Sequence, residues 1–196
     1  MNAIVLAGGR GLRMAGIEKA FLRLGGETFL DRALRLLAPL FDSLIVSASG
    51  AGPYARPGAR VVRDVREGGG PLVGLFSALE ASDSDLNFVT AVDAPLLQET
   101  LVLYLRENAP GCDALVPRSR KGIEPLCAVY SRRCLPAIER SLNQGRIVSF
   151  FPFVRVCWVP EDEVMAADPR GLSFINVNTP EDLRWLRRLD GELTPP

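Results

Sequence analysis

Short apolar runs alternate along this chain with longer stretches in which apolar residues recur at helical spacing. The apolar runs predict strands at 3–7, 43–48, 60–63, 87–92, 112–117, 125–130, 154–159 and 173–177. The amphipathic stretches predict helices at 28–38, 72–82, 98–108, 132–143 and 180–189. Strands that alternate with helices in this way are typical of an α/β fold with a mostly parallel central sheet.

The length of the chain, 196 residues, favours one domain over several. No linker separates two apolar segments, so we predict a single domain over 1–190. Within it, the segment from about 112 to 170 is predicted to form a sub-region that covers the functional site. The last residues, 191–196, are predicted to form a loose tail.

The charge balance excludes some classes of partner. Lysine and arginine number 23, as do aspartate and glutamate, so the formal net charge is zero. A general nucleic-acid or anionic-membrane binder carries excess positive charge, and we therefore predict neither kind of partner. The chain contains no histidine, which removes histidine-based acid–base catalysis and histidine metal ligands. Any catalysis must use carboxylates, Lys or Arg side chains, backbone amides or an oxygen-ligated cation.

The cysteines and the first residues of the chain indicate the cellular compartment in which the protein is expected. None of the four cysteines forms a Cys-x-x-Cys pair, so a zinc site is not expected. We interpret them as reduced thiols of a cytoplasmic protein. The first predicted strand starts at residue 3 without a basic lead-in, so no signal peptide is expected, and no apolar run approaches the length of a membrane span.

A loop rich in glycine and cationic residues follows the first predicted strand. Residues 7–14 read Ala-Gly-Gly-Arg-Gly-Leu-Arg-Met, and Lys19 follows shortly after. Glycines let backbone N–H groups approach phosphate oxygens, and cationic side chains neutralise them. The loop lacks the spacing of a P-loop, and Met14 stands where the dinucleotide-binding fingerprint requires a glycine. The open alternatives are a polyphosphate cradle of another kind and a plain glycine turn with exposed arginines.

Two aspartates follow predicted strands. Asp93 comes after 87–92 and Asp64 after 60–63. In open α/β sheets, ligands bind beyond the carboxyl ends of the strands. A carboxylate at the end of a strand can hold Mg²⁺ together with water and phosphate oxygens. The structural alternative for each aspartate is a turn or helix-capping role.

Three further segments allow both a functional and a structural interpretation. Asn176 and Asn178 would share one face of the predicted strand 173–177 and its continuation, or serve turn and cap chemistry before the helix at Pro180. The run 68–71, Gly-Gly-Gly-Pro, is a flexible loop or a place where the backbone approaches a base or ribose. The basic segment 118–122 is a solvated hairpin tip or a contact for a second anionic substrate.

The order of these motifs resembles the molybdenum cofactor guanylyltransferases, which make molybdopterin guanine dinucleotide. The motifs that carry the resemblance are Leu6-Ala7-Gly8-Gly9, Arg13-Met14, Lys19, Asp64, Gly70-Pro71-Leu72, Asp93-Ala94-Pro95-Leu96 and the segment 174–183. The match spans residues 3 to about 187. The resemblance implies a Rossmann-like, three-layer nucleotidyltransferase fold with a mostly parallel, mixed central sheet.

The resemblance also implies a reaction and its participants. GMP would pass from GTP to molybdopterin or the molybdenum cofactor, pyrophosphate would be released, and Mg²⁺ would be required. Proteins that deliver the cofactor and molybdoenzymes that accept the product are the implied protein partners.

The site residues follow from the matched positions. The resemblance places Leu6, Ala7, Gly8, Gly9 and Lys19 on GTP, Ser47 and Asp64 near guanosine, Asp93 on Mg²⁺, and Asn176 and Asn178 on the molybdopterin side. Arg13 and Lys19 would stabilise the leaving pyrophosphate, so Arg13, Lys19 and Asp93 are the predicted catalytic residues.

Three positions depart from the family pattern. Ser47 stands where the bacterial enzymes commonly have asparagine, Ala15 replaces a usual glycine, and Glu18 replaces a usual aspartate. The serine at position 47 leaves open a related nucleotidyltransferase that uses CTP or another phosphate acceptor. A further alternative, of a different class, is a nucleotide-binding partner protein without turnover.

Overall fold

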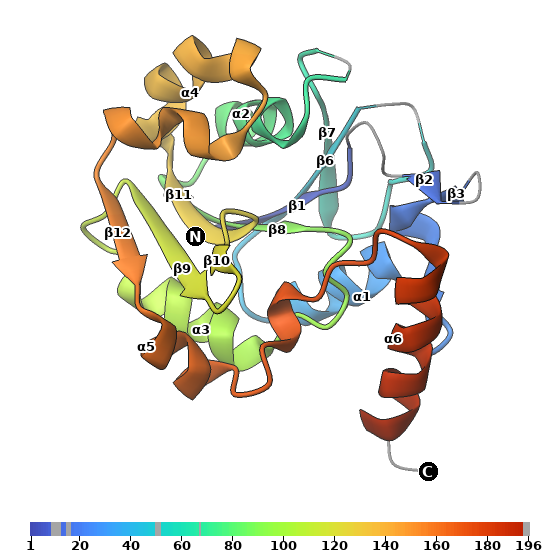
Figure 1. Ribbon diagram of the computed structural model, residues 1–196. Coiled ribbons are helices and arrows are strands. Elements are labelled where there is room, and N and C mark those ends of the chain that lie inside the picture. The colour runs from blue at the N-terminus through green and yellow to red at the C-terminus, as the bar shows by residue number, and fades with distance from the viewer. Residues whose placement is uncertain (9–12, 15–16, 50–51, 67, 194–196) are drawn as a thin grey trace.

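A computed structural model of the chain describes residues 1–8, 13–14, 17–49, 52–66 and 68–193. Its main feature is a mixed, mostly parallel sheet (Figure 1). The strands lie in the order β10 (Gly122–Ile123), β9 (Ala114–Ser119), β11 (Cys127–Ser131), β8 (Leu86–Ala91), β1 (Asn2–Leu6), β6 (Leu44–Ala48) and β7 (Ala59–Arg63), with β12 (Val156–Val159) paired to β9. Parallel pairing joins β8, β1, β6 and β7, and β11 is antiparallel to both of its neighbours. The predicted fold class is confirmed.

Helices cover both faces of the sheet and make three layers (Figure 1). One face carries α2 (Pro71–Ala81) and α4 (Leu135–Ser141), and the other carries α1 (Phe29–Leu37), α3 (Glu99–Asn108), α5 (Glu161–Ala167) and α6 (Pro180–Leu193). The helices on each face pack against the sheet around a separate hydrophobic core cluster. Because both faces are covered, β1 and β6 are buried along their whole length, as parallel strands generally are.

Short elements complete the chain. The two-residue strands β2 (Arg13–Met14) and β3 (Ile17–Glu18) pair with each other, as do β4 (Arg23–Leu24) and β5 (Glu27–Thr28). The 3-10 turns are η1 (Lys19–Phe21), η2 (Arg132–Cys134), η3 (Leu142–Gln144), η4 (Ile147–Phe153) and η5 (Leu172–Phe174). Among the described residues, no helix combines the length and the hydropathy that crossing a bilayer requires.

Two of the predicted helices, α1 and α6, have side-chain capping at their first turn. Thr28 is the N-cap residue of α1, and its hydroxyl accepts a hydrogen bond from the backbone N–H of Asp31 at 3.1 Å. At α6 the Asp182 carboxylate accepts the N–H groups of Asn178 and Thr179, and the Thr179 hydroxyl accepts the N–H of Asp182. This reciprocal arrangement is a capping box, which fixes the direction in which the chain enters α6.

The predicted strand 173–177 is wrong. This segment forms η5 and an irregular run after it. The buried Asp168 carboxylate accepts hydrogen bonds from the N–H groups of Leu172 and Ser173 at 3.1 and 2.8 Å. These two donors are therefore satisfied without a neighbouring strand. The amphipathic stretch 132–143 is also divided, into η2, α4 and η3, and α5 was not predicted.

The interpretation of all four cysteines as reduced thiols is wrong for two of them. Cys112 and Cys157 form a disulfide with their Cα atoms 5.9 Å apart, while Cys127 and Cys134 are free and buried. The two partners are 45 residues apart, and the parallel pairing of β12 with β9 brings them together. The cytoplasmic location loses the support that reduced thiols gave it and stays a prediction.

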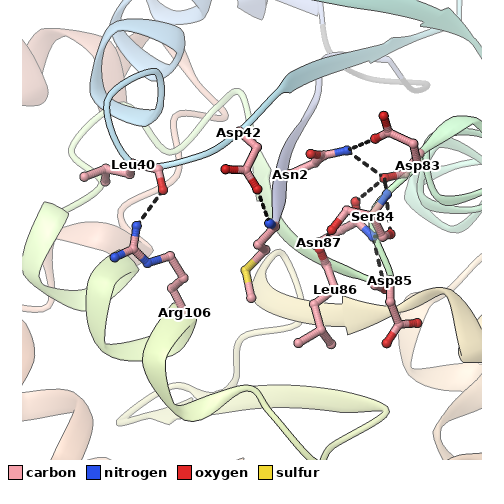
Figure 2. A network of polar contacts seen from close by, with 11 residues as sticks. Asn2, Leu40, Asp42, Asp83, Ser84, Asp85, Leu86, Asn87 and Arg106 are labelled. Carbon is pink, nitrogen blue, oxygen red and sulfur yellow. Dashed lines mark hydrogen bonds and ion pairs between the residues drawn. The ribbon is translucent and has the colours of Figure 1, made fainter.

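A polar network closes the amino-terminal edge of the sheet (Figure 2). The buried Asn2 amide donates to the Ser82 hydroxyl at 3.0 Å and to the Asp83 carboxylate at 2.7 Å. Ser82 in turn donates to the amide oxygen of Asn87, which lies opposite Asn2 in the β1–β8 register. This network satisfies the buried amides where the two strands begin, and the opposite edge of the sheet holds the predicted site residues.

The extent of the domain stays a prediction. In the structure, α6 continues through Leu193, so the helix reaches into the segment 191–196 that we predicted as a loose tail. Residues 194–196 lie outside the described part of the chain.

Candidate active site

The carboxyl ends of four parallel strands gather the residues that the sequence singled out. Asp93 follows β8, Ala7 and Gly8 follow β1, Ser47 lies near the end of β6, and Asp64 follows β7. These strands are consecutive neighbours in the sheet. Since adjacent strands lie about 4.8 Å apart, the four positions span about 14 Å along one edge. That is the length scale of a nucleoside triphosphate laid across the sheet.

A cation–carboxylate–amide cluster lies at the β8 end of this edge. The Nζ atom of Lys19 donates to Oδ2 of Asp93 at 2.9 Å and to Oδ1 of Asn178 at 2.7 Å. The side chains of Lys19 and Asp93 are 4% and 14% exposed. A buried ammonium needs such partners, because removing a charge from water is costly. Three segments far apart in sequence are therefore joined at one ammonium group.

The backbone holds each member of this cluster in place. The N–H of Val177 donates to the carbonyl of Asp93 at 2.9 Å, which ties the Asn178 segment to the end of β8. Lys19 is the first residue of η1, and the N–H of Leu22 donates to the carbonyl of Lys19 at 3.1 Å. The site thus depends on short loops fixed by main-chain hydrogen bonds.

The residue before Lys19 has a partner that sequence reasoning missed. The hydroxyl of the buried Tyr54 donates to the carboxylate of Glu18, and the Tyr54 ring lies 5.3 Å from that of Phe21. Tyr54 thus braces the chain on both sides of Lys19. The only sequence signal was one aromatic residue within the Pro- and Gly-rich stretch 50–58.

A second cluster lies at the β6 and β7 ends. The Ser47 hydroxyl lies 2.5 Å from Oδ1 of Asp64, to which it donates, and 3.2 Å from the carbonyl of Gly74. Asp64 is 8% exposed. Burial raises the pKa of the Asp64 carboxyl above its ordinary value, and the hydrogen bond from Ser47 partly offsets this rise.

Two glycines let the backbone come close to these polar groups. A Cβ atom on Gly8 would lie 2.5 Å from the backbone nitrogen of Ser49 and 2.9 Å from Oδ2 of Asp64. A Cβ atom on Gly74 would lie 3.0 Å from the Ser47 hydroxyl oxygen. The first turn of α2, which contains Gly74, therefore faces the Ser47–Asp64 pair, and its N-terminus adds positive potential there.

The glycine run before α2 is shaped by its neighbours. Gly70 has a φ of 75°, which favours glycine, and its Cβ position would lie 3.0 Å from the carbonyl of Gly145. Pro71 then takes the first position of α2. The run thus forms the helix entry beside the Ser47–Asp64 pair, and contact with a base or ribose stays a prediction.

Other predicted site residues are placed less centrally. Asn176 and Asn178 are both exposed, and of the two it is Asn178 that accepts a hydrogen bond from Lys19. The basic segment 118–122 includes Arg118, whose guanidinium carbon lies 4.7 Å from the centroid of the Trp158 ring, and Arg120, which pairs with Glu161 at 3.4 Å. Gly9 lies outside the described residues, and of Arg13 only the backbone is described, paired with Glu18 beside Lys19.

The donor set suits one kind of cation. Among the described residues, no three His, Cys, Asp or Glu side chains gather as a metal cage. Asp93 therefore offers a single carboxylate at the β8 end of the edge. Mg²⁺ is commonly bound through one or two carboxylates, with substrate phosphates and water as its remaining ligands. The residues present fit a magnesium ion held between Asp93 and a bound polyphosphate.

The fold and this edge together define an α/β nucleotidyltransferase, an enzyme that joins a nucleotide to an acceptor. The chain belongs to the MobA-like NTP transferase domain family, whose family model matches residues 3–155. This confirms the family resemblance and the enzyme class that the sequence motifs predicted.

Two curated relatives are similar over most of the chain. A probable molybdenum cofactor guanylyltransferase of Pelotomaculum thermopropionicum is 40% identical, over 93% of this chain and 89% of its own length. A molybdenum cofactor guanylyltransferase of Desulfosudis oleivorans is 36% identical, over 93% of this chain and 92% of its own length.

Solved structures share the fold. Molybdopterin-guanine dinucleotide biosynthesis protein A from Archaeoglobus fulgidus superposes with a TM-score of 0.83 at 27% identity, covering 98% of this chain and 100% of that one. 4-Diphosphocytidyl-2C-methyl-D-erythritol synthase from Anaerococcus prevotii superposes with a TM-score of 0.70 at 17% identity, covering 96% and 94%. The second likeness concerns the fold alone.

Proposed function

We propose that this chain is a Mg²⁺-dependent guanylyltransferase that transfers GMP from GTP to the phosphate of molybdopterin or its molybdenum form. The observation that carries the proposal is the cluster of Lys19, Asp93 and Asn178 at the carboxyl edge of the sheet. The end of β1 separates this cluster from the Ser47–Asp64 pair at the ends of β6 and β7. The names of the curated relatives support the choice of substrates.

GTP would lie along the edge with its base near β6 and β7. An ionised Asp64 carboxylate only accepts hydrogen bonds, and guanine presents N–H donors on its Watson–Crick edge. Ser47 donates to one oxygen of Asp64, and the other oxygen faces the Gly8 position. The phosphates would then extend past Ala7 and Gly8 towards Lys19.

The transfer needs no strong base. The phosphomonoester of the acceptor is mostly ionised near neutral pH, because its second pKa is about 6. One of its oxygens would attack the α-phosphorus of GTP, forming a new P–O bond. The bond from that phosphorus to the bridging oxygen breaks, and pyrophosphate leaves with the electron pair. The absence of histidine is consistent with this chemistry.

The chain's own groups would position the reactants and neutralise their charge. The Lys19 ammonium, already oriented by Asp93 and Asn178, would bind the phosphates of the leaving group. Arg13 is proposed to act with it. Asp93 would hold Mg²⁺, which when bound lowers the charge repulsion between the reacting phosphates.

Pyrophosphate release tests the proposal. Purified protein with Mg²⁺ and molybdopterin should release pyrophosphate with GTP and far less with CTP, ATP or UTP. Release with CTP in preference to GTP would favour the alternative based on Ser47, a related nucleotidyltransferase that uses CTP. Nucleotide binding without release, under conditions in which a curated relative turns over, would contradict the proposal.

A further inference from the structure

A groove opens on the far side of Asp93 from the Ser47–Asp64 pair. It has a volume of about 330 Å³ and lies between the tip of the β9–β10 hairpin, α5 and its following turn, η5 and α6. Figure 1 shows the chain running from α5 through the orange-red η5 segment to α6. None of the roles assigned above uses this groove.

The strand order separates the groove from the nucleotide. β9 is antiparallel to β11, which is antiparallel to β8, so β9 ends at the same edge as Asp93. The hairpin tip that lines the groove directly follows β9. With a strand spacing of about 4.8 Å, the end of β9 lies about 10 Å from the end of β8 and about 24 Å from the end of β7. A nucleotide whose base lies at Asp64 therefore ends near Asp93 and leaves the groove open.

One continuous segment connects the groove to the catalytic cluster. Phe174 and Ile175 line the groove. Two residues further on, the N–H of Val177 donates to the Asp93 carbonyl, and Asn178 accepts from Lys19. A molecule lying in the groove could thus extend one end to the Lys19–Asp93 pair.

The lining has the chemistry of a site for a flat anion. Three cationic side chains line it, Arg120, Lys121 and Arg170, against one acidic side chain, Glu161, which pairs with Arg120. The walls also include Phe174, Ile175 and Trp185, and Trp185 is 44% exposed. An exposed indole stacks well on a planar heterocycle, and the cationic rim favours negative charge.

We propose that this groove binds the organic body of the acceptor, an anionic molecule with a flat ring system, and that Trp185, Lys121 and Arg170 contact the acceptor but not the nucleotide. The inference rests on the proposed transfer to a phosphomonoester, and it assigns to acceptor recognition Trp185 and Arg170, which neither the motifs nor the relatives identified. It also gives the basic segment 118–122 a function that the sequence left open.

Binding of molybdopterin to groove variants tests the proposal. The variants are Trp185→Ala and the double variant Lys121→Ala/Arg170→Ala. The matched controls are Phe153→Ala, at a phenylalanine 64% exposed in η4, and Arg140→Ala, on α4 across the sheet. Anaerobic calorimetric titration measures the Kd for molybdopterin and, separately, for GTP with Mg²⁺.

Each groove variant should weaken molybdopterin binding about tenfold or more. GTP binding should stay within about twofold, because these are surface positions remote from the nucleotide. The controls should change neither constant. The acceptor KM in the pyrophosphate assay should rise in parallel with the Kd.

The possible failures are distinguishable. If wild-type protein binds molybdopterin and the groove variants bind it equally well, the groove inference is wrong and the transferase proposal stands. If wild-type protein does not bind molybdopterin at all, both are wrong. If the variants lose molybdopterin binding but turnover requires CTP, the groove inference stands and the guanylyl assignment fails.

Discussion

The Nζ atom of Lys19 lies 2.9 Å from Oδ2 of Asp93, although 74 residues separate them in the sequence. Both side chains are largely shielded from water. Solvent and salt therefore screen the pair less than an ion pair on the surface. The same carboxylate is the proposed magnesium ligand, and the same ammonium is the proposed phosphate contact. The two groups that would neutralise a polyphosphate are thus held together before it binds.

Replacement of Lys19 tests the charge at this centre. Lys19→Ala should lower kcat/KM for pyrophosphate release by about 10²-fold or more, because a preorganised cation aimed at the developing charge is lost. The variant should also lose about 1–3 kcal/mol of stability, since Asp93 and Asn178 lose their common partner. Urea denaturation monitors the fold, and Arg140→Ala is a control for loss of a cation. Near-normal turnover of Lys19→Ala would contradict its role.

The two asparagines should differ in effect. Asn178→Ala removes a side-chain acceptor of the Lys19 ammonium and leaves Asp93 as its partner, so it should lower kcat/KM about tenfold. Asn176→Ala leaves both of these Lys19 hydrogen bonds in place and should have the smaller effect on kcat/KM. Steady-state kinetics of the two variants give the comparison, and a larger loss in Asn176→Ala would show that Asn178 does not position Lys19.

Gly8 should tolerate no side chain. Gly8→Ala would bring a Cβ atom within 2.5 Å of a backbone nitrogen, so the loop must shift, and we expect GTP affinity to fall about tenfold or more. Gly191→Ala is the matched control, because a Cβ atom there meets nothing within 4 Å and alanine favours the helix. Equal GTP affinity in both variants, measured by calorimetry, would argue against close approach of the nucleotide at Gly8.

Asp64 should make stability depend on pH in a defined direction. Because its folded-state pKa is raised above 3.8, the folded protein holds this proton more tightly than the unfolded chain. The contribution of Asp64 is therefore fully present at low pH and is lost as pH rises through the raised pKa. Asp64→Asn lacks this titration, so its stability relative to wild type should increase with pH and then level off. Urea denaturation from about pH 3 to about pH 7 measures the difference, and a constant difference would contradict the raised pKa.

The sequence predicted the architecture of the site because its signals are local. An apolar run before a glycine loop, and an aspartate after an apolar run, place residues at strand ends without knowledge of the neighbours. The parallel topology then brings Asp64 and Asp93 to one edge. The start of α6 could also be predicted from local sequence, because Thr179 and Asp182 cap the helix within its first turn.

The sequence could not reveal pairings that depend on the tertiary structure. The bond between Tyr54 and Glu18 joins residues 36 positions apart, and nothing in either segment indicates the other. The disulfide between Cys112 and Cys157 depends on where β12 pairs along β9. The segment 173–177 is apolar and alternating like a strand, yet the carboxylate of Asp168 satisfies its first backbone donors.

The fate of the α-phosphate tests the central claim most directly. With GTP labelled at the α-phosphorus, Mg²⁺ and molybdopterin, the label should appear in a molybdopterin guanine dinucleotide, and label at the β- and γ-positions should appear in pyrophosphate. Lys19→Ala and Asp93→Ala should each slow both transfers together. Label released as free GMP, as inorganic phosphate from the γ-position, or not at all in the presence of the acceptor would contradict guanylyl transfer by this site.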